Sequence, residues 1–330
     1  MSLDVLVVGG GSIGERHLRC FQQVEPCRVS ICESMDERRE GLVKSYGVTG
    51  YRSVSEAVSM NWDLVVIATP AHLHIEHAIA FQDSTSAWLI EKPLGVSMDR
   101  VDELQRITSD RIVGVAYVYR AHPAYQAVRK MIQENAYGAV RQVTIVSGQH
   151  FPTFRPAYRD IYYTDLKTGG GAVQDAATHL FNLMQYLVGP LDWVFCDYDH
   201  QALPGVVVED TVHLTARAGG DVMLNLSINQ FMSPNESVVQ VNAIEGSLRV
   251  NAHQHRYGVM RCGETEWTWS DTLISERDEL FRLQAQYTVD ACEGRGPVLC
   301  SLDEAVHTLK VNLAALESKG ARVIQIEDVT

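Results

Sequence analysis

Short apolar runs alternate with amphipathic segments over the first third of the chain. The runs have the character of strands that are buried on both faces of a parallel sheet, and they occupy 3–8, 28–32, 63–69, 87–90 and 112–116. Segments with helical spacing separate them, at 15–23, 36–46, 53–58 and 97–109. Strands joined by helices in this way predict a doubly wound α/β domain, in which ligands bind at the carboxyl ends of the strands.

The pattern changes after residue 122, where polar and apolar residues alternate with a period of two. The alternating segments are 140–149, 193–199, 211–218, 221–230, 237–244, 247–251, 257–262 and 266–269. They predict a mainly antiparallel sheet with one buried face. Helices are expected at 123–134, 275–293 and 302–319, with a last strand at 323–326. The second part of the chain is therefore expected to be an α+β domain built on a large open sheet.

A chain of 330 residues is longer than one hydrophobic core usually supports. We expect two domains, at 1–121 and 122–330, with the final helix and strand as candidates to pack back on the first domain. Because a sheet with an uncovered face usually meets another subunit, we expect a homodimer or a homotetramer formed through it.

A glycine-rich turn joins the first predicted strand to the first helix. Gly9, Gly11 and Gly14 stand in the G-x-G-x-x-G frame. The first glycine suits a tight turn, the second lets the backbone approach a pyrophosphate, and the third lets the helix pack closely on the strand. Ser12 and Ile13 lie at the helix start, where free N–H groups face an anion. The turn predicts a dinucleotide-binding site.

Glu33 ends the second predicted strand, roughly twenty residues beyond the glycines, as in dinucleotide-binding sites. A carboxylate at this place would accept the adenosine ribose hydroxyls of NAD and repel the additional phosphate of NADP. NAD is therefore the favoured cofactor, although Arg38 and Arg39 leave NADP open. The alternative interpretation of Glu33 is an ordinary charge at a strand end.

A glycine-led helix at 168–189 stands out in the second domain. Three glycines, at 169–171, precede Asp175 and His179, which are four residues apart and so share a helix face. The opposite face carries an apolar stripe of Leu180, Leu183, Met184 and Leu187. Such a pair often has no catalytic role. The preceding stretch, 155–167, is rich in Tyr and Arg, and it is either a substrate-binding segment or a surface loop that is stabilised by stacking.

Composition excludes several classes of partner. The net charge of −13 argues against binding of nucleic acid, and no apolar run approaches the roughly 20 residues of a membrane helix. The N-terminus enters a strand without a signal-peptide pattern, so a cytoplasmic protein is expected. The seven cysteines are irregularly spaced, which predicts reduced structural thiols, and no metal site is expected.

The motifs together resemble the Gfo/Idh/MocA family of NAD(P)-dependent oxidoreductases over essentially the whole chain. The segments that carry the resemblance are GGGSIGERHL at 9–18, ATPAHLHIEHA at 68–78, EKPL at 91–94, YRAHP at 119–123, GGGAVQDAATH at 169–179 and the closing 301–320. The resemblance implies a Rossmann domain at 1–121 for the cofactor and a domain at 122–330 for substrate binding and oligomerisation.

The resemblance also implies roles for individual residues. Lys92, Asp175 and His179 match the family's catalytic set, and the bond before Pro93 is expected to be cis. The residues that match the cofactor-binding segments are Thr69, Pro70, His74, Glu91 and Lys92. The expected substrate contacts are Lys92, Tyr163, Lys167, Asp175 and His179.

These residue types suit the oxidation of a secondary alcohol, in which hydride leaves carbon while a proton leaves oxygen. We expect His179 to take the proton, Lys92 to polarise the oxygen or relay the proton, and Asp175 to orient the imidazole or bind a substrate hydroxyl. A polyhydroxylated substrate, such as a sugar, an inositol or a sugar derivative, fits these polar groups. A non-catalytic nucleotide-sensing protein and a dehydrogenase of a non-sugar substrate, such as a dihydrodiol or an imine, are the alternatives.

Overall fold

The computed structural model describes residues 2–25, 27–274, 276 and 278–330. The chain divides into two compact units, which are Met1–Ala121 with Glu276–Val306, and His122–Ser275 with His307–Thr330. The division after residue 121 lies at the expected boundary. Residues 276–306, which the sequence analysis assigned to the second domain, group with the first unit instead.

The first unit is built on a six-stranded sheet with the order β3-β2-β1-β4-β5-β6. Its strands are β1 (Leu3–Val8), β2 (Cys27–Cys32), β3 (Thr49–Tyr51), β4 (Leu64–Ile67), β5 (Ala87–Ile90) and β6 (Ile112–Val115). All neighbouring strands are parallel. This arrangement confirms the predicted doubly wound sheet. Strand β3 was not predicted, because three residues of mixed character carry no period.

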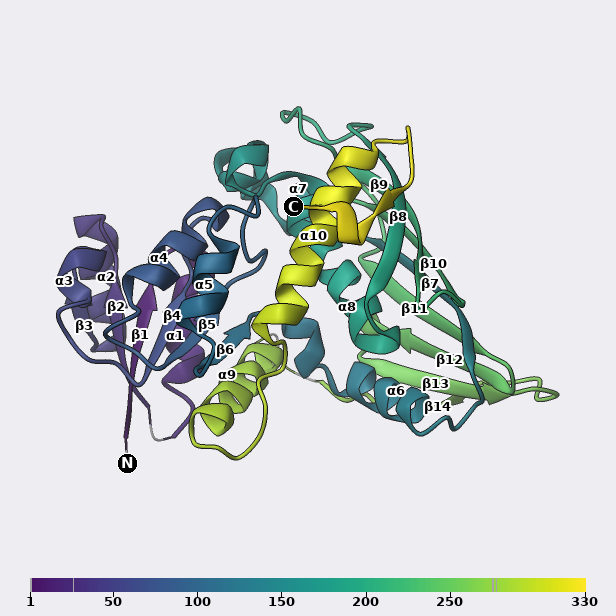
Figure 1. Cartoon of the computed structure of the whole chain (residues 1–330), viewed down its shortest axis with the longest axis horizontal. Coiled ribbons are helices and arrows are strands. Elements are labelled where there is room, and N and C mark those ends of the chain that lie inside the picture. Colours follow the sequence, from purple (N-terminus) through teal and green to yellow (C-terminus); the bar gives the residue numbers. More distant parts are fainter. Residues whose placement is uncertain (1, 26, 275, 277) are drawn as a thin grey trace. The chain divides into compact units, whose positions relative to one another are not determined.

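Helices lie on both sides of this sheet (Figure 1). They are α1 (Ser12–Phe21), α2 (Asp36–Tyr46), α3 (Val54–Ala57), α4 (His74–Ala80), α5 (Val101–Ile107) and α9 (Glu279–Cys292), with 3-10 turns η1 (Ala71–Leu73) and η2 (Val118–Ala121). Helix α5 is shorter than the predicted 97–109, since Arg100 before it has a left-handed backbone (φ +60°). The expected start of α9, Ser275, lies outside the described residues.

Helix α9 belongs to the first unit because it packs against α1. Asp278, which precedes α9, accepts a 2.7 Å hydrogen bond from Nε of Arg19. The ring of Phe281 lies under the guanidinium of Arg16 at 4.8 Å and meets His17 edge-on at 5.9 Å. Ala285 and Val289 extend the apolar core of the sheet. These contacts explain why the domain assignment by chain order was wrong for this segment.

The second unit is built on a nine-stranded sheet with the order β14-β13-β12-β11-β7-β10-β9-β8-β15. Its strands are β7 (Val140–Gly148), β8 (Leu191–Asp199), β9 (Thr211–Ala218), β10 (Val222–Asn229), β11 (Glu236–Ala243), β12 (Gly246–Asn251), β13 (Arg256–Arg261), β14 (Thr268–Trp269) and β15 (Ile324–Gln325). Only β7 and β10 pair in parallel, so the predicted, mainly antiparallel sheet is confirmed. The last strand, β15, pairs with β8 in this unit and does not return to the first domain.

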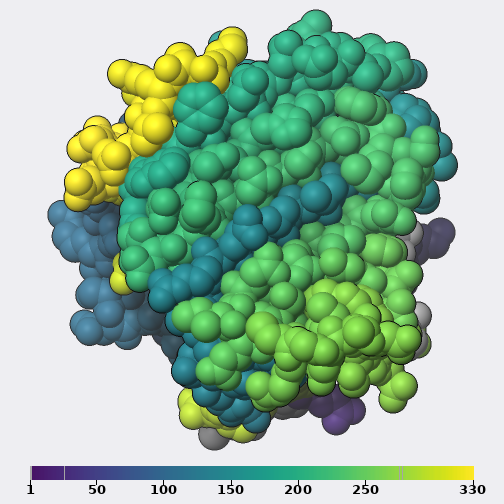
Figure 2. Space-filling view, turned by 90° about the vertical axis from the view of Figure 1, so that its right-hand side faces the viewer, coloured from purple at the N-terminus to yellow at the C-terminus, as the bar shows by residue number. Residues whose placement is uncertain are grey.

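Helices cover one face of this sheet (Figure 1). They are α6 (Pro123–Gln133), α8 (Thr178–Val188) and α10 (Leu302–Ser318), and α7 (Phe151–Phe154) lies in an irregular stretch with the short turns η3 (Pro156–Asp160), η4 (Tyr162–Thr164) and η5 (Leu166–Thr168). Strand residues alternate accordingly, with Val143 and Ile145 buried and Gln142 and Val146 exposed. Figure 2 looks onto the other face, across which the strands run exposed. Among the described helices, none combines the length and apolar character that crossing a bilayer requires.

Candidate active site

The glycine turn of the first unit is closely packed at one glycine and open at another. A Cβ atom at Gly14 would lie 1.8 Å from the carbonyl oxygen of Gly9, so the close helix packing predicted for this position is confirmed. A Cβ atom at Gly11 would meet nothing within 4 Å. Gly11 precedes α1, and its carbonyl accepts the first hydrogen bond of the helix, from the N–H of Glu15. The N–H groups of the first turn therefore begin at an open surface, which suits an anion.

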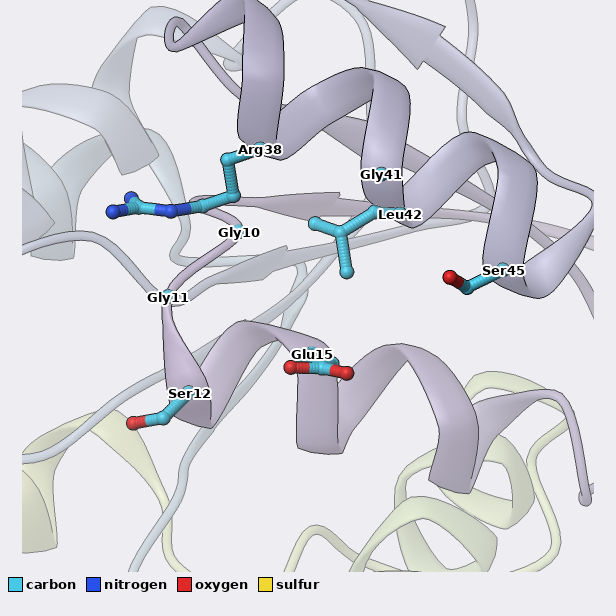
Figure 3. A pocket seen from close by; sticks show the side chains of 8 residues that line it. All are labelled: Gly10, Gly11, Ser12, Glu15, Arg38, Gly41, Leu42 and Ser45. Atoms are coloured by element: carbon cyan, nitrogen blue, oxygen red, sulfur yellow. The ribbon is translucent and has the colours of Figure 1, made fainter.

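A groove of about 400 Å³ opens beside this turn, between α1 and α2 (Figure 3). It is lined by Gly10, Gly11, Ser12, Glu15, Arg38, Gly41, Leu42 and Ser45. Ser12 is exposed, whereas the side chain of Ile13 packs against the core, so Ile13 would contact a ligand in the groove through its backbone. The guanidinium of Arg38 extends over the glycine turn (Figure 3).

Glu33 lies beneath the same turn, with only 6% of its side chain exposed. Its carboxylate accepts hydrogen bonds from the N–H groups of Gly10 and Met35, both at 2.8 Å, and lies 3.4 Å from Arg38. Burial alone would raise the pKa of Glu33, but the two N–H donors and Arg38 outweigh it and lower that pKa. The carboxylate is therefore ionised and held in place. Arg39 is buried and donates to the carbonyl of Glu33, so it supports the turn and is not open to a phosphate.

His74 binds two backbone carbonyls below the strand ends. Its Nδ1 lies 2.8 Å from the carbonyl oxygen of Pro93, and its Nε2 lies 2.7 Å from that of Thr69. The ring is 1% exposed, and burial lowers the pKa of His74 against the effect of the two carbonyls. His74 therefore ties together the loops that carry Thr69 and Pro93, and its expected contact with a cofactor stays a prediction. Pro70 itself is exposed.

Glu91 is also buried and holds the loop that carries Lys92. It is 5% exposed, and its Oε1 lies 2.7 Å from Nε2 of His17 on α1. Its Oε2 accepts the N–H of Lys92 at 3.0 Å. Burial would raise the pKa of Glu91, but His17 and Lys92 together lower it. The peptide bond between Lys92 and Pro93 is cis, as the resemblance implies.

The glycine-led helix of the second unit opens with a wide turn. The segment Val173–Ala177 is a π-helix that runs directly into α8, where the prediction was a regular α-helix. Such turns recur at functional sites. Asp175 lies within it and His179 follows one turn later, so both still belong to one face. The apolar stripe predicted on the other side is buried as expected.

Asp175 is almost fully buried and is held by two side chains of the preceding stretch. Its Oδ1 accepts a 2.7 Å hydrogen bond from the hydroxyl of Tyr162, and its Oδ2 accepts a 3.1 Å bond from Arg155. Asp175 is 3% exposed, whereas Arg155 and His179 both reach solvent. The helix thus carries a desolvated, hydrogen-bonded carboxylate four residues before an imidazole that reaches solvent.

Two of the expected substrate contacts have different surroundings. Tyr163 is 1% exposed and packs with Phe151 at 5.3 Å, and its hydroxyl donates to the carbonyl of Glu209 and to Gln230. Burial raises the pKa of Tyr163 well above its ordinary value. Tyr163 therefore belongs to the core, which argues against the expected substrate contact. Lys167 is exposed, next to the glycines.

The contacts of Arg155 and Tyr162 with Asp175 were not predicted from the sequence. Both lie in the stretch that was expected to bind substrate, but short 3-10 turns give that stretch no regular period. The only sequence signal was its content of Tyr and Arg, which does not distinguish the buried Tyr163 from the exposed Tyr162.

Comparison with known proteins connects both units to one family. Residues 3–119 match the model described as "Oxidoreductase family, NAD-binding Rossmann fold", and residues 125–249 match the GFO/IDH/MocA C-terminal domain. Levoglucosan dehydrogenase of Pseudarthrobacter phenanthrenivorans is 27% identical over an alignment of 214 residues that covers 57% of this chain and 52% of the relative. Inositol 2-dehydrogenase of Rhizobium meliloti is 27% identical over 192 residues, 57% of this chain and 56% of the relative. The chain thus spans about half the length of these relatives in the matched region.

Solved structures extend the likeness of the fold to the whole chain. Levoglucosan dehydrogenase in complex with NADH superimposes with a TM-score of 0.88 at 21% identity and covers 99% of both chains. An oxidoreductase from Agrobacterium radiobacter in complex with NAD+, L-tartaric acid and magnesium superimposes with a TM-score of 0.86 at 16% identity and covers 100% of both chains. With both domain models matched in order along the sequence, the chain belongs to the Gfo/Idh/MocA family of oxidoreductases.

Proposed function

We propose that this protein is an NAD-dependent dehydrogenase that transfers hydride between a secondary alcohol of a sugar, an inositol or a sugar derivative and the nicotinamide. The observation that carries the proposal is the pair Asp175 and His179 on a glycine-led helix, with the Asp175 carboxylate already desolvated and hydrogen-bonded. The relatives named levoglucosan dehydrogenase and inositol 2-dehydrogenase support a polyhydroxylated substrate.

The residues of the first unit fit a dinucleotide. The space that a side chain would fill at Gly11 is open, and the first turn of α1 begins there. The ionised Glu33 suits the ribose hydroxyls of NAD, and its charge disfavours the additional phosphate of NADP. When it is bound, NAD supplies the hydride acceptor. Gly9, Gly11, Ser12, Ile13, Gly14 and Glu33 would hold it, with Thr69 and Pro70 alongside.

Three side chains would then handle the proton and the reacting oxygen. The imidazole of His179 takes the proton of the substrate hydroxyl, because an imidazole titrates near neutrality. Asp175, fixed by Tyr162 and Arg155, orients the imidazole or accepts a second substrate hydroxyl. The ammonium of Lys92 polarises the reacting oxygen, and proton transfer through Lys92 is the alternative division of the work. Lys167 is the remaining proposed substrate contact.

We also propose that the protein is a homodimer or a homotetramer, formed through the uncovered sheet face (Figure 2). Polar side chains bridge its strands, with Asn242 donating to Gln142 at 2.9 Å and Arg249 donating to Gln240 at 2.7 Å. Arg249 also stacks over Trp267 at 4.7 Å.

Thr144→Arg places a charge on the outward side of β7, and we expect it to lower the mass measured by sedimentation. A cytoplasmic location remains a prediction.

The experiment that tests the function follows the reduction of NAD+ over a panel of sugars, inositols, sugar acids, nucleotide sugars and a dihydrodiol, with NADP+ in parallel. We expect at least one polyol or sugar to reduce NAD+ faster than NADP+. Binding of NAD+ without reduction by any compound of the panel would favour the nucleotide-sensing alternative. Reduction by a dihydrodiol alone would move the substrate outside the sugars.

A further inference from the structure

We propose that Glu209 is the positioning residue for the turn that carries Asp175. Glu209 lies two residues before the start of β9 and is 5% exposed. It lies in none of the motifs through which the chain resembles its family. The inference rests on the proposed function only in assigning catalysis to Asp175 and His179, since the contacts of Glu209 stand by themselves.

Two consecutive N–H groups at the start of the helix bind to Glu209. The N–H of Ala172 donates to its backbone carbonyl at 2.9 Å, and the N–H of Val173 donates to Oε1 of its carboxylate at 3.0 Å. The first N–H groups of a helix have no partner within the helix. Val173 is also the first residue of the π-turn, so the carboxylate binds the turn at its beginning, two residues before Asp175.

The carboxylate also occupies the space that a side chain at position 171 would need. A Cβ atom at Gly171 would lie 2.3 Å from Oε1 and 2.5 Å from Oε2 of Glu209, and the backbone there has a φ of +81°. This contact explains the third glycine of the run, which the resemblance left without a physical reason. Gly171 and Glu209 therefore act together, because the missing side chain at position 171 leaves the space in which the Glu209 carboxylate lies, although the two residues are distant in the sequence.

Glu209 is itself held from two sides. Its neighbour Asp210 is fully buried and accepts the N–H groups of Gln201, Ala202 and Leu203 at 2.9, 2.8 and 2.6 Å. The hydroxyl of Tyr163 donates to the carbonyl of Glu209 at 3.2 Å. The backbone that carries the Glu209 side chain is thus held by contacts other than the bond to the helix, as a positioning residue requires.

Burial makes the charged form of the Glu209 carboxyl group unfavourable, whereas a side chain that only filled the space would carry no charge. Burial and the nearby Asp210 raise the pKa of Glu209, although the N–H of Val173 opposes them. A glutamine would fill the same space with an amide oxygen as acceptor and without this cost. The Glu209→Gln variant therefore separates the acceptor from the charge, whereas Glu209→Ala removes both.

The test measures kcat, KM and local hydrogen exchange in Glu209→Ala and Glu209→Gln, with Glu236→Ala as the matched control at an exposed site of the same unit. We expect Glu209→Ala to lower kcat by about 10- to 100-fold, as a small misplacement of catalytic groups does, with the dissociation constant of NAD+ unchanged. Glu209→Gln should recover kcat to within about threefold of the wild type, since it keeps the acceptor. Glu236→Ala should leave every readout unchanged.

Hydrogen exchange of the peptide that contains residues 171–179 gives a readout that does not depend on turnover. We expect faster exchange in Glu209→Ala and wild-type protection in Glu209→Gln, at temperatures where both remain folded. If Glu209→Ala does not fold, Gly171→Ala supplies the same displacement from the other side and should also accelerate exchange. Wild-type kcat and wild-type protection in Glu209→Ala would overturn the proposal. An inactive wild type with the expected exchange pattern would instead refute the proposed function alone.

Discussion

The hydroxyl of Tyr162 donates a 2.7 Å hydrogen bond to Oδ1 of Asp175. The next residue, Tyr163, turns its hydroxyl the other way, to the carbonyl of Glu209 and the side chain of Gln230. Two adjacent tyrosines therefore have separate tasks. Tyr162 is 45% exposed and contacts the buried carboxylate, whereas Tyr163 is 1% exposed and contacts the core.

Replacing each tyrosine by phenylalanine separates these tasks. Tyr162→Phe removes one of the hydrogen bonds that fix Asp175, so we expect a several-fold lower kcat and a change in the free energy of unfolding within about 0.5 kcal/mol. Tyr163→Phe removes the donor to the buried Oε1 of Gln230, so we expect a loss of about 1–2 kcal/mol in the free energy of unfolding. Urea unfolding and steady-state kinetics check both. A larger loss of stability in Tyr162→Phe than in Tyr163→Phe would contradict the assignment.

Two glycines of the nucleotide turn give opposite expectations for the same change. Gly14→Ala places a methyl group 1.8 Å from a backbone oxygen, so we expect a loss of several kcal/mol in the free energy of unfolding. Gly11→Ala meets no atom within 4 Å and has a φ of −66°, so we expect a stable protein. Its methyl group enters the space expected for the pyrophosphate, and the dissociation constant of NAD+ should rise about tenfold or more. Calorimetric titration with NAD+ checks this, and unchanged affinity in Gly11→Ala would place the dinucleotide elsewhere.

Glu33 is expected to determine the choice between NAD and NADP. Glu33→Gln removes the charge, so we expect the ratio of kcat/KM for NAD+ to that for NADP+ to fall roughly tenfold. A glutamine has one carbonyl oxygen, whereas Glu33 accepts from both Gly10 and Met35. We therefore also expect about 1–2 kcal/mol less stability. Glu40→Gln, at an exposed position of α2, is the control and should leave the ratio unchanged. An unchanged ratio in Glu33→Gln would show that the choice lies elsewhere.

The burial of His122 predicts that the free energy of unfolding falls in acid. This histidine is 2% exposed and stacks on His255, and burial with that neighbour lowers the pKa of His122 from 6.5 to about 4. The unfolded chain gains a proton near pH 6.5, whereas the folded protein gains it only near pH 4, so stability falls as the pH falls between these values. A shift of this size corresponds to a loss on the order of 3 kcal/mol.

The Nδ1 of His122 accepts the N–H of Ala124 at the start of α6, so asparagine is the suitable replacement because it also caps helices. We expect His122→Asn to lose less stability than the wild type between pH 6.5 and 4, in urea unfolding at several pH values. His213→Asn, at an exposed position of β9, should follow the wild type. Parallel curves for wild type and His122→Asn would assign the acid sensitivity to other groups.

The sequence predicted those parts of the fold that have a period. The buried runs of the first unit and the alternating strands of the second became sheets in the expected positions. Helix α9 was assigned to the wrong unit, because its partners His17 and Arg19 are distant in the sequence and no local pattern encodes that contact. Similarly, β15 pairs with β8 through a contact of long range.

The candidate site divides in the same way. Motif spacing selected Glu33, whereas the resemblance to the family selected Lys92, Asp175 and His179. Burial decided the rest. His74 and Glu91 support backbone, Tyr163 belongs to the core, and Tyr162 and Arg155 hold Asp175. Whether a tyrosine faces the core or the carboxylate depends on the 3-10 turns around it, which have no signature in the sequence.

His179 provides the most direct test of the proposed chemistry. With the substrate identified from the panel, His179→Ala is compared with His213→Ala, in which an exposed histidine of the same unit is removed. We expect His179→Ala to lower kcat by about 10²- to 10⁴-fold, as loss of a general base does, while the dissociation constant of NAD+ and the melting temperature stay at wild-type values. Turnover within a few-fold of the wild type in His179→Ala would contradict its role as the base.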